Sequence, residues 1–470
     1  APVNTPNASG GVNQSISQTS QRAIYQWQSF DIGANSSVTF DMADKGYSAL
    51  NRVMGGTAPS QIFGKLTATK GGEIYLINAN GILFGKGAQV NTGSLIASAL
   101  NLTDDEFKSG LTNSLLYNTL SPTFKYDGEA ANFVDSKNFV RVDEGATITT
   151  DNGGRVFLFA KRVENAGSIS TPGGQTLLAG GGAIYLQRPD SRPLYASETN
   201  PDVPALRGLL VEVGAGPKDA EDRQGSVVNT TSGLISTARG NTTLVGMTVN
   251  QMGRISATTS VTENGSIILR AQGNAKAGTS SVDATQAGAL VLGAGSQTTI
   301  APDNAAEQNG NKPLTSDGNA TFVAPRIDLA GASVLLDTGA KIIAPGATVD
   351  VRAEKVPNYE PTATRGYAAD KGVDEASRIV LAEDALIDVS GTTDTVASVS
   401  QFFVTTGLLG SNDLKDAPIQ KDGLLYRSKV TVDVRQDSAL LGSLEGYRDG
   451  IQQTIGERLS AGGKVRLTAG

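Results

Sequence analysis

Apolar and polar residues alternate along most of the chain, in runs of four to six residues that follow soon after a glycine. Examples are residues 155–159 (RVFLF), 242–246 (TTLVG), 266–269 (SIIL) and 464–467 (KVRL). Alternation over this length, bounded by Gly and Asn, is typical of β-strands. The pattern therefore predicts an all-β protein.

Short segments that end in isoleucine recur at a nearly constant spacing. Three pairs show it: residues 148 and 169 (21 apart), 235 and 255 (20 apart), and 342 and 387 (45 apart, close to two steps). A unit of this length cannot bury its own apolar face, but stacked copies bury a continuous core. Leucine-rich repeats need a regular Leu and Asn pattern that is absent here, and β-propellers need units of roughly 40 residues. The period thus predicts a right-handed parallel β-helix, with about 15 to 20 coils that rise roughly 4.8 Å each.

Stretches rich in Pro, Asp, Glu, Lys and Asn interrupt this repeat, and we expect them to protrude from the corners of the coils. Residues 104–140 are expected to form a loop or a small extra-helical element. Longer insertions are expected at about 187–224, 302–318, 355–376 and 395–428. The expected organisation is a domain at 1–185, with an N-terminal cap and the first coils, followed by a β-helix shaft at 186–470.

Composition narrows the class of partner and the compartment. The 470 residues carry a formal net charge of -7 with no basic cluster, which argues against nucleic acid or an anionic membrane as a partner. The absence of cysteine fits a chain that crosses an oxidising periplasm. The chain opens on Ala1 without a Met or an apolar leader, as a processed exported protein does, and it stops just after a strand-like run. We therefore expect a fragment of a larger exported protein.

The residues available for catalysis are few, because the chain contains no histidine and no cysteine. Histidine-dependent triads and histidine-ligated metals are thereby excluded within it. Paired carboxylates are the remaining candidates, and repeat spacing could bring together Asp328 with Asp350, or Asp384 with Asp388. Scattered acids on a solenoid surface are the simpler interpretation. We expect no enzyme, no cofactor and no metal.

Two other features have a functional and a structural interpretation. Asp104, Asp105 and Glu106 could bind Ca²⁺, but their spacing lacks an EF-hand pattern, so a solvated loop is expected. Trp27 is the only tryptophan and lies in an alternating run, which favours packing in the core or the cap over a ligand platform.

Residues 23–100 carry the most distinctive motifs. They are Asn51-Arg52-Val53, then Ser60-Gln61-Ile62 followed by Gly64 and Leu66, then Asn78-Ala79-Asn80-Gly81-Ile82. Taken alone they read as strands joined by Asn and Gly turns, since both residues tolerate positive φ. Their order and spacing closely resemble the secretion domain of two-partner secretion exoproteins, the filamentous haemagglutinin family. One departure is Ala79, because that family usually has proline between the two asparagines.

The resemblance covers the first 185 residues or so, and the later coils more loosely. It implies a monomeric β-helix that is secreted from, or displayed on, a Gram-negative cell by way of the periplasm. It also implies a partner, a cognate outer-membrane β-barrel transporter with periplasmic recognition domains. The secretion motif would comprise Asn51, Arg52, Val53, Gln61, Asn78, Asn80, Gly81 and Ile82. The asparagines would either contact the transporter or hold turns through hydrogen bonds within the chain.

Three functions stay open for the whole protein. The first is a surface or released adhesin that binds a host-cell or polysaccharide receptor and predicts a long repetitive remainder. The second is a cytolysin or contact-dependent toxin, which predicts a distinct C-terminal domain. The third is a carbohydrate-active lyase or hydrolase, which predicts cleavage of acidic glycans by this chain.

Overall fold

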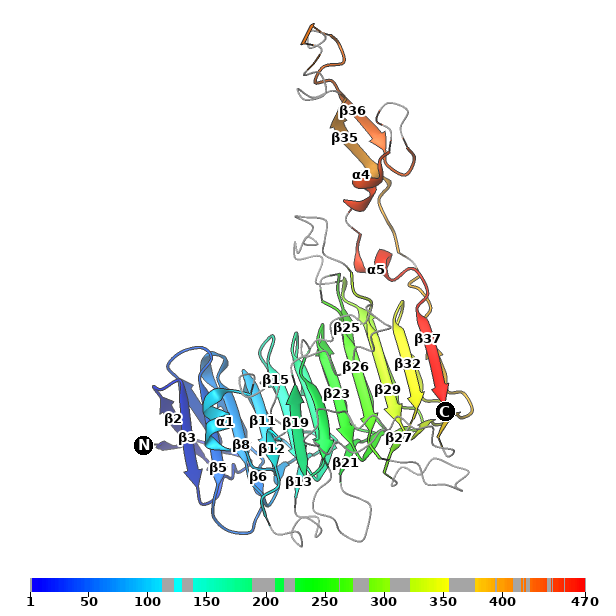
Figure 1. The fold of residues 1–470 in the computed structure, drawn as a ribbon. Coiled ribbons are helices and arrows are strands. Elements are labelled where there is room, and N and C mark those ends of the chain that lie inside the picture. The colour runs from blue at the N-terminus through cyan, green and yellow to red at the C-terminus, as the bar shows by residue number, and fades with distance from the viewer. Residues whose placement is uncertain are drawn as a thin grey trace.

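The chain winds into a long β-helix, seen in the computed structural model in Figure 1. Its strands form three long sheets, called A, B and C here, that run from the N-terminal end to the C-terminal end. The structure describes residues 2–111, 122–128, 138–187, 208–214, 225–261, 263–273, 287–304, 322–354, 377–393, 395–408, 416, 418–419, 423–437, 441, 443–451 and 453–469.

Sheet A has 12 strands and begins with an antiparallel hairpin, after which every pair is parallel. In order they are β1 (Val3–Pro6), β2 (Val12–Gln18), β4 (Ser37–Met42), β7 (Lys65–Ala68), β10 (Gln89–Thr92), β14 (Thr147–Thr150), β17 (Ser168–Ser170), β22 (Leu234–Ala238), β25 (Arg254–Thr259), β28 (Gln297–Pro302), β31 (Lys341–Ile343) and β34 (Leu386–Asp388).

Sheets B and C are parallel throughout. The 11 strands of sheet B are β3 (Arg22–Trp27), β5 (Ser48–Val53), β8 (Glu73–Ile77), β11 (Ser94–Ser98), β15 (Arg155–Ala160), β18 (Gln175–Gly180), β23 (Asn241–Gly246), β26 (Ser266–Ala271), β29 (Arg326–Gly331), β32 (Thr348–Ala353) and β37 (Lys464–Ala469). The nine strands of sheet C are β6 (Ser60–Ile62), β9 (Ile82–Phe84), β13 (Phe139–Val142), β16 (Arg162–Asn165), β21 (Ser226–Asn229), β24 (Thr248–Gln251), β27 (Ala289–Leu292), β30 (Ser333–Leu336) and β33 (Arg378–Leu381).

The isoleucine repeat is the register of sheet A. Ile148 pairs with Ile169, Ile169 with Ile235, and Ile235 with Ile255, so equivalent residues of successive coils stack directly. These side chains are at most 1% exposed and belong to one core that runs the length of the coil. The predicted all-β parallel β-helix is confirmed. Within the residues that the structure describes, sheet B has 11 strands and so shows 11 coils rather than the expected 15 to 20, because excursions from the coil use part of the chain.

Two described excursions leave the coil between a strand of sheet B and the following strand of sheet C. This B–C corner is where the chain departs after β11 and β18. A further excursion leaves between sheets A and B, after β34. The predicted insertion at 355–376 lies outside the described residues, as does most of 302–318. The boundary between the predicted domains at 185 stays a prediction.

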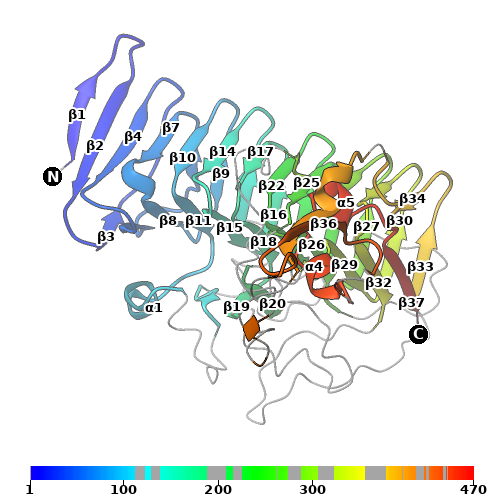
Figure 2. The ribbon, with the colours of Figure 1, turned by 90° about the horizontal axis from the view of Figure 1, so that it is seen from above.

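Two of these excursions cover the outer face of sheet B near the N-terminal end. They contribute helix α1 (Asp104–Ser109) and an antiparallel sheet of β12 (Phe124–Lys125), β19 (Ala183–Gln187) and β20 (Leu210–Gly214). Figure 2 shows α1, β19 and β20 outside the coil, beside sheet B. Outward-pointing residues of sheet B such as Ile96 and Phe157 are buried beneath them in a second apolar cluster. The loop or small element predicted at 104–140 therefore contains a helix and a strand.

The last excursion is longer than the predicted 395–428, because the coil resumes only at β37. It contains η3 (Val399–Phe402), a hairpin of β35 (Phe403–Gly407) and β36 (Lys429–Asp433), α4 (Glu445–Asp449) and α5 (Ile455–Arg458). Figure 1 shows β35, β36 and α4 standing away from the shaft as a projecting arm. Hydrogen bonds from the backbone and hydroxyl of Thr392, to Leu459 and Gly456 respectively, close its base. No helix in the described ranges has the length and apolar character to cross a membrane.

Candidate functional site

The first and third motifs meet at the B–C corner of the first coils. Asn51-Arg52-Val53 ends strand β5, and Asn78-Ala79-Asn80 follows strand β8, which pairs with β5 in register. Ser60-Gln61-Ile62 forms β6, the next strand after the same corner, and pairs with Ile82-Leu83-Phe84 in β9. Sequence segments 20 to 30 residues apart are therefore stacked at one place because the coil has that period.

Asn51 is fully buried and serves the fold at this corner. Its Oδ1 accepts a hydrogen bond of 3.0 Å from Trp27 Nε1, and its Nδ2 donates to the carbonyl of Tyr75 at 3.2 Å. The side chain thus joins three successive strands of sheet B, β3, β5 and β8. Buried amides are satisfied in this way because an unpaired buried polar group is costly.

Asn78 is also buried, and it organises the turn that carries its motif. Its Oδ1 accepts from the backbone of Asn80, and its Nδ2 donates to Ser60 Oγ at 3.1 Å. The backbone of Gly81 donates to the carbonyl of Asn78, which closes a β-turn over Ala79 and Asn80. Neither of these two central residues has positive φ, so the turn is of type I, while Gly81 adopts φ of 108°.

Asn80 and Ala79 face outward at the tip of this turn. Ala79 is exposed and Asn80 is half-buried. Asn80 Nδ2 donates to the carbonyl of Gly56 at 3.3 Å, so the third motif also holds the loop that follows the first.

Arg52 links the first motif to the excursion that contains α1. Its guanidinium donates to Asp104 Oδ1 and to the carbonyl of Leu102, each at 2.6 Å. The acidic run is not the solvated loop that its sequence predicts, because Thr103 caps α1 and forms a capping box with Glu106. Asp104 lies in the first turn of that helix, where a carboxylate is favoured.

A groove opens between the motifs and this excursion, and we call it the corner groove. It holds about 480 Å³, and its lining includes Arg52, Met54, Ala79, Asn80, Asp104 and Asp127. Asp127 accepts a hydrogen bond of 2.7 Å from Asn101, which lies opposite Lys125 in a short antiparallel bridge. Met54 is 64% exposed, an unusual position for a large apolar side chain.

The other predicted motif residues play supporting roles. Ile82 is fully buried in the core, and Val53 packs against the core from the corner. Gln61 has an exposed side chain, while its backbone N–H donates a hydrogen bond to Asp31 Oδ1. Gln61 does not line the corner groove, whereas Arg52, Val53 and Asn80 do.

Trp27 packs as expected of a cap or core residue. Its ring meets Phe30 edge to face at 5.4 Å between ring centroids, and Tyr25 packs in the same way against Phe40 at 5.9 Å. These rings close the N-terminal end of the core beside the corner. Trp27 thereby connects the aromatic end of the core to the buried side chain of Asn51.

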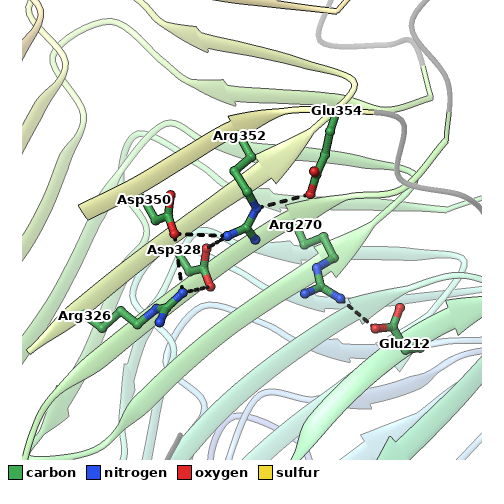
Figure 3. A network of polar contacts seen from close by, with 7 residues as sticks. All are labelled: Glu212, Arg270, Arg326, Asp328, Asp350, Arg352 and Glu354. Carbon is green, nitrogen blue, oxygen red and sulfur yellow. Dashed lines mark hydrogen bonds and ion pairs between the residues drawn. The ribbon is translucent and has the colours of Figure 1, made fainter. Parts of the chain in front are cut away.

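The paired acids Asp328 and Asp350 do come together, as register partners in β29 and β32, but each is held by arginines (Figure 3). Arg352 Nη1 lies 3.0 Å from Asp328 and 3.3 Å from Asp350, and Arg326 pairs with both acids as well. Burial alone would lower the pKa of Arg352, yet Asp328, Glu354 and Asp350 together raise it. The cluster is a ladder of ion pairs across coils, with no uncompensated carboxylate pair for acid–base chemistry.

The second acid pair does not converge in this way. Asp388 is half-buried at the end of β34, and hydrogen bonds from Ser390 lower its pKa. Asp384 lies in the preceding turn, with φ of 57°. Among the residues that the structure describes, no three Asp or Glu side chains gather as a metal site.

Sequence analysis missed several residues of the corner groove, namely Met54, Asn101 and Asp127, and assigned Asp104 to a loop. One signal was available, since Thr103 and Glu106 have capping-box spacing and predict the start of a helix. Nothing in the sequence indicated that this helix would lie against Arg52.

Comparison with known proteins supports the resemblance. Residues 1–209 match the family model of the TPS (two-partner secretion) secretion domain. A heme/hemopexin-binding protein of Haemophilus influenzae is 45% identical over 87 residues, 18% of this chain and 9% of that protein. A counterpart from strain Rd is 44% identical over 92 residues, 20% of this chain and 10% of that protein.

The chain thus matches about a tenth of the length of these curated relatives. Among solved structures, the HMW1 secretion domain from Haemophilus influenzae aligns with 83% of this chain and 97% of its own, at 19% identity and a TM-score of 0.44. The family match, together with the motifs stacked at one corner, identifies residues 1–209 of this chain as belonging to the TPS secretion domain family.

Proposed function

We propose that residues 1–209 direct export of this chain by binding the periplasmic domains of a cognate outer-membrane transporter. The B–C corner of the first coils is the contact surface in this proposal. The observation that carries it is the convergence of Arg52, Val53 and Asn80 on one open groove, although the sequence separates the two motifs by more than 20 residues.

The geometry divides the motif residues into two groups. Asn51 and Asn78 are buried and hydrogen-bonded, so we assign them to holding the corner in shape. Ala79, Asn80 and Met54 face outward, so we assign them to contact with the transporter. Both groups are required for export, but for different physical reasons.

An export assay with three variants tests this division. The chain, preceded by a signal peptide, is produced in a Gram-negative host with and without the transporter. Asn80→Ala is expected to reduce export while the purified protein melts within a few degrees of the wild type. Asn51→Ala is expected to reduce both export and stability.

Asn91→Ala is the matched control, because Asn91 is an exposed asparagine of sheet A in a neighbouring coil. Export of this variant should equal that of the wild type. Wild-type release into the medium that does not depend on the transporter would refute the proposal.

For the whole protein we propose an adhesin that is released or held at the cell surface. The elongated shaft and the projecting arm suit a molecule that presents binding elements away from a membrane. The relatives named for binding heme or hemopexin match this chain only over a short segment, so we do not propose that ligand for this chain. Adherence of bacteria that secrete the full-length exoprotein, compared with bacteria that lack it, tests the adhesin proposal. The adhesin proposal would be contradicted if bacteria with and without the exoprotein adhered equally well, both to host cells and to polysaccharide-coated surfaces.

A further inference from the structure

The hairpin of the projecting arm has an edge, on the β35 side, to which no other strand pairs within the residues that the structure describes. We propose that this edge pairs antiparallel with β35 of a second copy of the chain, so that two arms join in one four-stranded sheet. The arm lies outside residues 1–209 and stands away from the shaft (Figure 1). The contact forms between chains that have already folded, so the inference is independent of the transporter contact.

The hydrogen bonds of the hairpin show which backbone groups face this edge. The N–H of Val434 donates to the carbonyl of Phe402, directly opposite, at 2.9 Å. Hydrogen-bonded pairs alternate with non-bonded pairs along an antiparallel ladder. The next bonded residues of β35 are therefore even-numbered, and the N–H and C=O groups of Phe403, Thr405 and Gly407 point away from β36.

The same three residues are exposed, and β35 lacks the usual protection of an edge strand. Phe403 is 47% exposed, and no described atom lies within 4 Å of the place where a side chain at Gly407 would begin. Charged residues and proline keep natural strand edges from pairing with other chains, but β35 (FVTTG) contains none. The opposite edge of the hairpin, β36, carries Lys429 and Asp433. The unprotected edge is therefore that of β35.

The sequence of β35 is complementary to itself. When Thr405 lies opposite its own copy on a two-fold axis, Phe403 of each chain lies opposite Gly407 of the other. An aromatic ring opposite an edge glycine covers the backbone that the glycine leaves bare. The symmetry repeats this contact at both ends of the strand. Pairing also turns two isolated hairpins, each marginally stable as two strands, into a four-stranded sheet.

Other partners have less support from the hairpin. A strand of a receptor would meet the same backbone groups, but only a second copy of this chain brings the matching Phe403 and Gly407. A charged ligand would meet no charge on β35. Because the contact is a single short strand, we expect a weak dimer that forms where many chains are held close together, as on one cell surface or between neighbouring cells.

Sedimentation equilibrium of the full chain tests the proposal, at protein concentrations from about 10 μM to about 500 μM. We expect the wild type to shift from monomer to dimer within this range. Thr405→Lys should weaken the dimer by about tenfold or more, because the two-fold axis places the two lysines side by side and like charges directly opposite are destabilising.

The matched control is Thr431→Lys. The hydroxyls of Thr405 and Thr431 share a hydrogen bond of 2.8 Å, so each substitution removes the same bond and adds the same charge. Only Thr405 lies on the free edge. In the dimer the two copies of residue 431 are separated by both β35 strands, so salt screens their charges and the control should dimerise within a factor of about two of the wild type.

A chain in which a short Gly-Ser linker replaces residues 396–452 supplies a second test, because it lacks the hairpin and should stay monomeric. A wild type that stays monomeric throughout the range, as the family resemblance implies, would overturn the inference. So would equal weakening by Thr405→Lys and Thr431→Lys, or a dimer that persists without the arm.

Discussion

Asn51, Asn78 and Asn80 supply much of the polar contact between the first coils. The family resemblance places all three asparagines in one secretion motif, but the structure gives them different surroundings. Asn51 and Asn78 are at most 1% exposed, whereas Asn80 lies at the tip of a turn. Their substitution should therefore affect stability unequally.

Asn51→Ala should lower the free energy of unfolding by about 1–3 kcal/mol. The substitution leaves the indole N–H of Trp27 and the carbonyl of Tyr75 without their buried partner. Urea denaturation followed by circular dichroism measures the change. Asn91→Ala, on the exposed face of sheet A, should shift the free energy by less than about 0.5 kcal/mol. Equal midpoints for the two variants would contradict the assigned role.

The buried hydroxyl of Tyr75 should make the protein less stable at alkaline pH. Burial raises the pKa of its hydroxyl far above the usual value of 10.0, and the nearby carboxylate of Glu73 raises it further. Above pH 10 the unfolded chain loses this proton while the folded chain keeps it, so stability falls as the pH rises. The expected slope from this residue is about 1.4 kcal/mol per pH unit.

Denaturant titrations at pH 9, 10 and 11 measure that slope. Tyr75→Phe should be less sensitive to pH over this range, because the Phe side chain has no proton to lose. An unchanged slope in Tyr75→Phe would show that another group is responsible.

At the scale of elements, the turn after β8 explains why alanine is accepted between the two asparagines. The turn is of type I, and proline is favoured at its second position, which Ala79 occupies. Ala79→Pro should therefore raise the free energy of unfolding by about 0.4–1 kcal/mol, by restricting the unfolded chain. Thermal melting measures the gain.

The adjacent position supplies the control. Asn80→Pro would remove the backbone N–H that donates to Asn78 Oδ1. Proline is also disfavoured at the third position of a type I turn. This variant should be less stable than the wild type, and a gain in stability at both positions would contradict the turn assignment.

A buried ion pair joins the sheet outside the coil to sheet B. Glu212 of β20 is 2% exposed and meets Arg270 of β26 at 2.6 Å, while Gln272 donates to its other oxygen (Figure 3 shows Glu212 and Arg270). Arg270→Met should destabilise the protein by about 3–5 kcal/mol, because it removes an arginine that pairs with a buried carboxylate. The double variant Arg270→Met with Glu212→Gln should recover part of this loss. Equal stability of both variants would contradict the pairing.

Periodic elements were predictable from the sequence, and elements outside the period were not. The spacing of Ile148 and Ile169 predicts the coil, because equivalent core positions recur every turn. The same period predicts that motifs one coil apart will stack. It cannot place α1 on Arg52 or β20 on Arg270, since those contacts join segments more than 50 residues apart that follow no repeat. The corner groove lies between a periodic and a non-periodic part, so only half of it was predictable.

At the scale of the whole molecule, the projecting arm is separable from the shaft. Its buried residues Val434, Leu444 and Ile455 belong to neither large apolar cluster of the shaft. Replacing residues 396–452 by a four-residue Gly-Ser linker should leave the melting temperature within a few degrees and transporter-dependent export unchanged. Calorimetry and the export assay measure these two quantities.

Loss of export without loss of folding would give the arm a part in secretion instead. If the shortened chain unfolds, the shaft depends on the arm. Retained export with reduced adherence of the full-length exoprotein would locate receptor binding in the arm.

The packing of Trp27 makes its fluorescence a probe of how the first coils fold. Trp27 lies in β3 and receives its hydrogen-bond partner, Asn51, only when β5 pairs with β3. Its emission spectrum should therefore shift to shorter wavelength when the second strand of sheet B closes on the first, whatever the state of later coils. Since no other tryptophan contributes, fluorescence of the unlabelled chain offers a time-resolved signal for the first step of its folding.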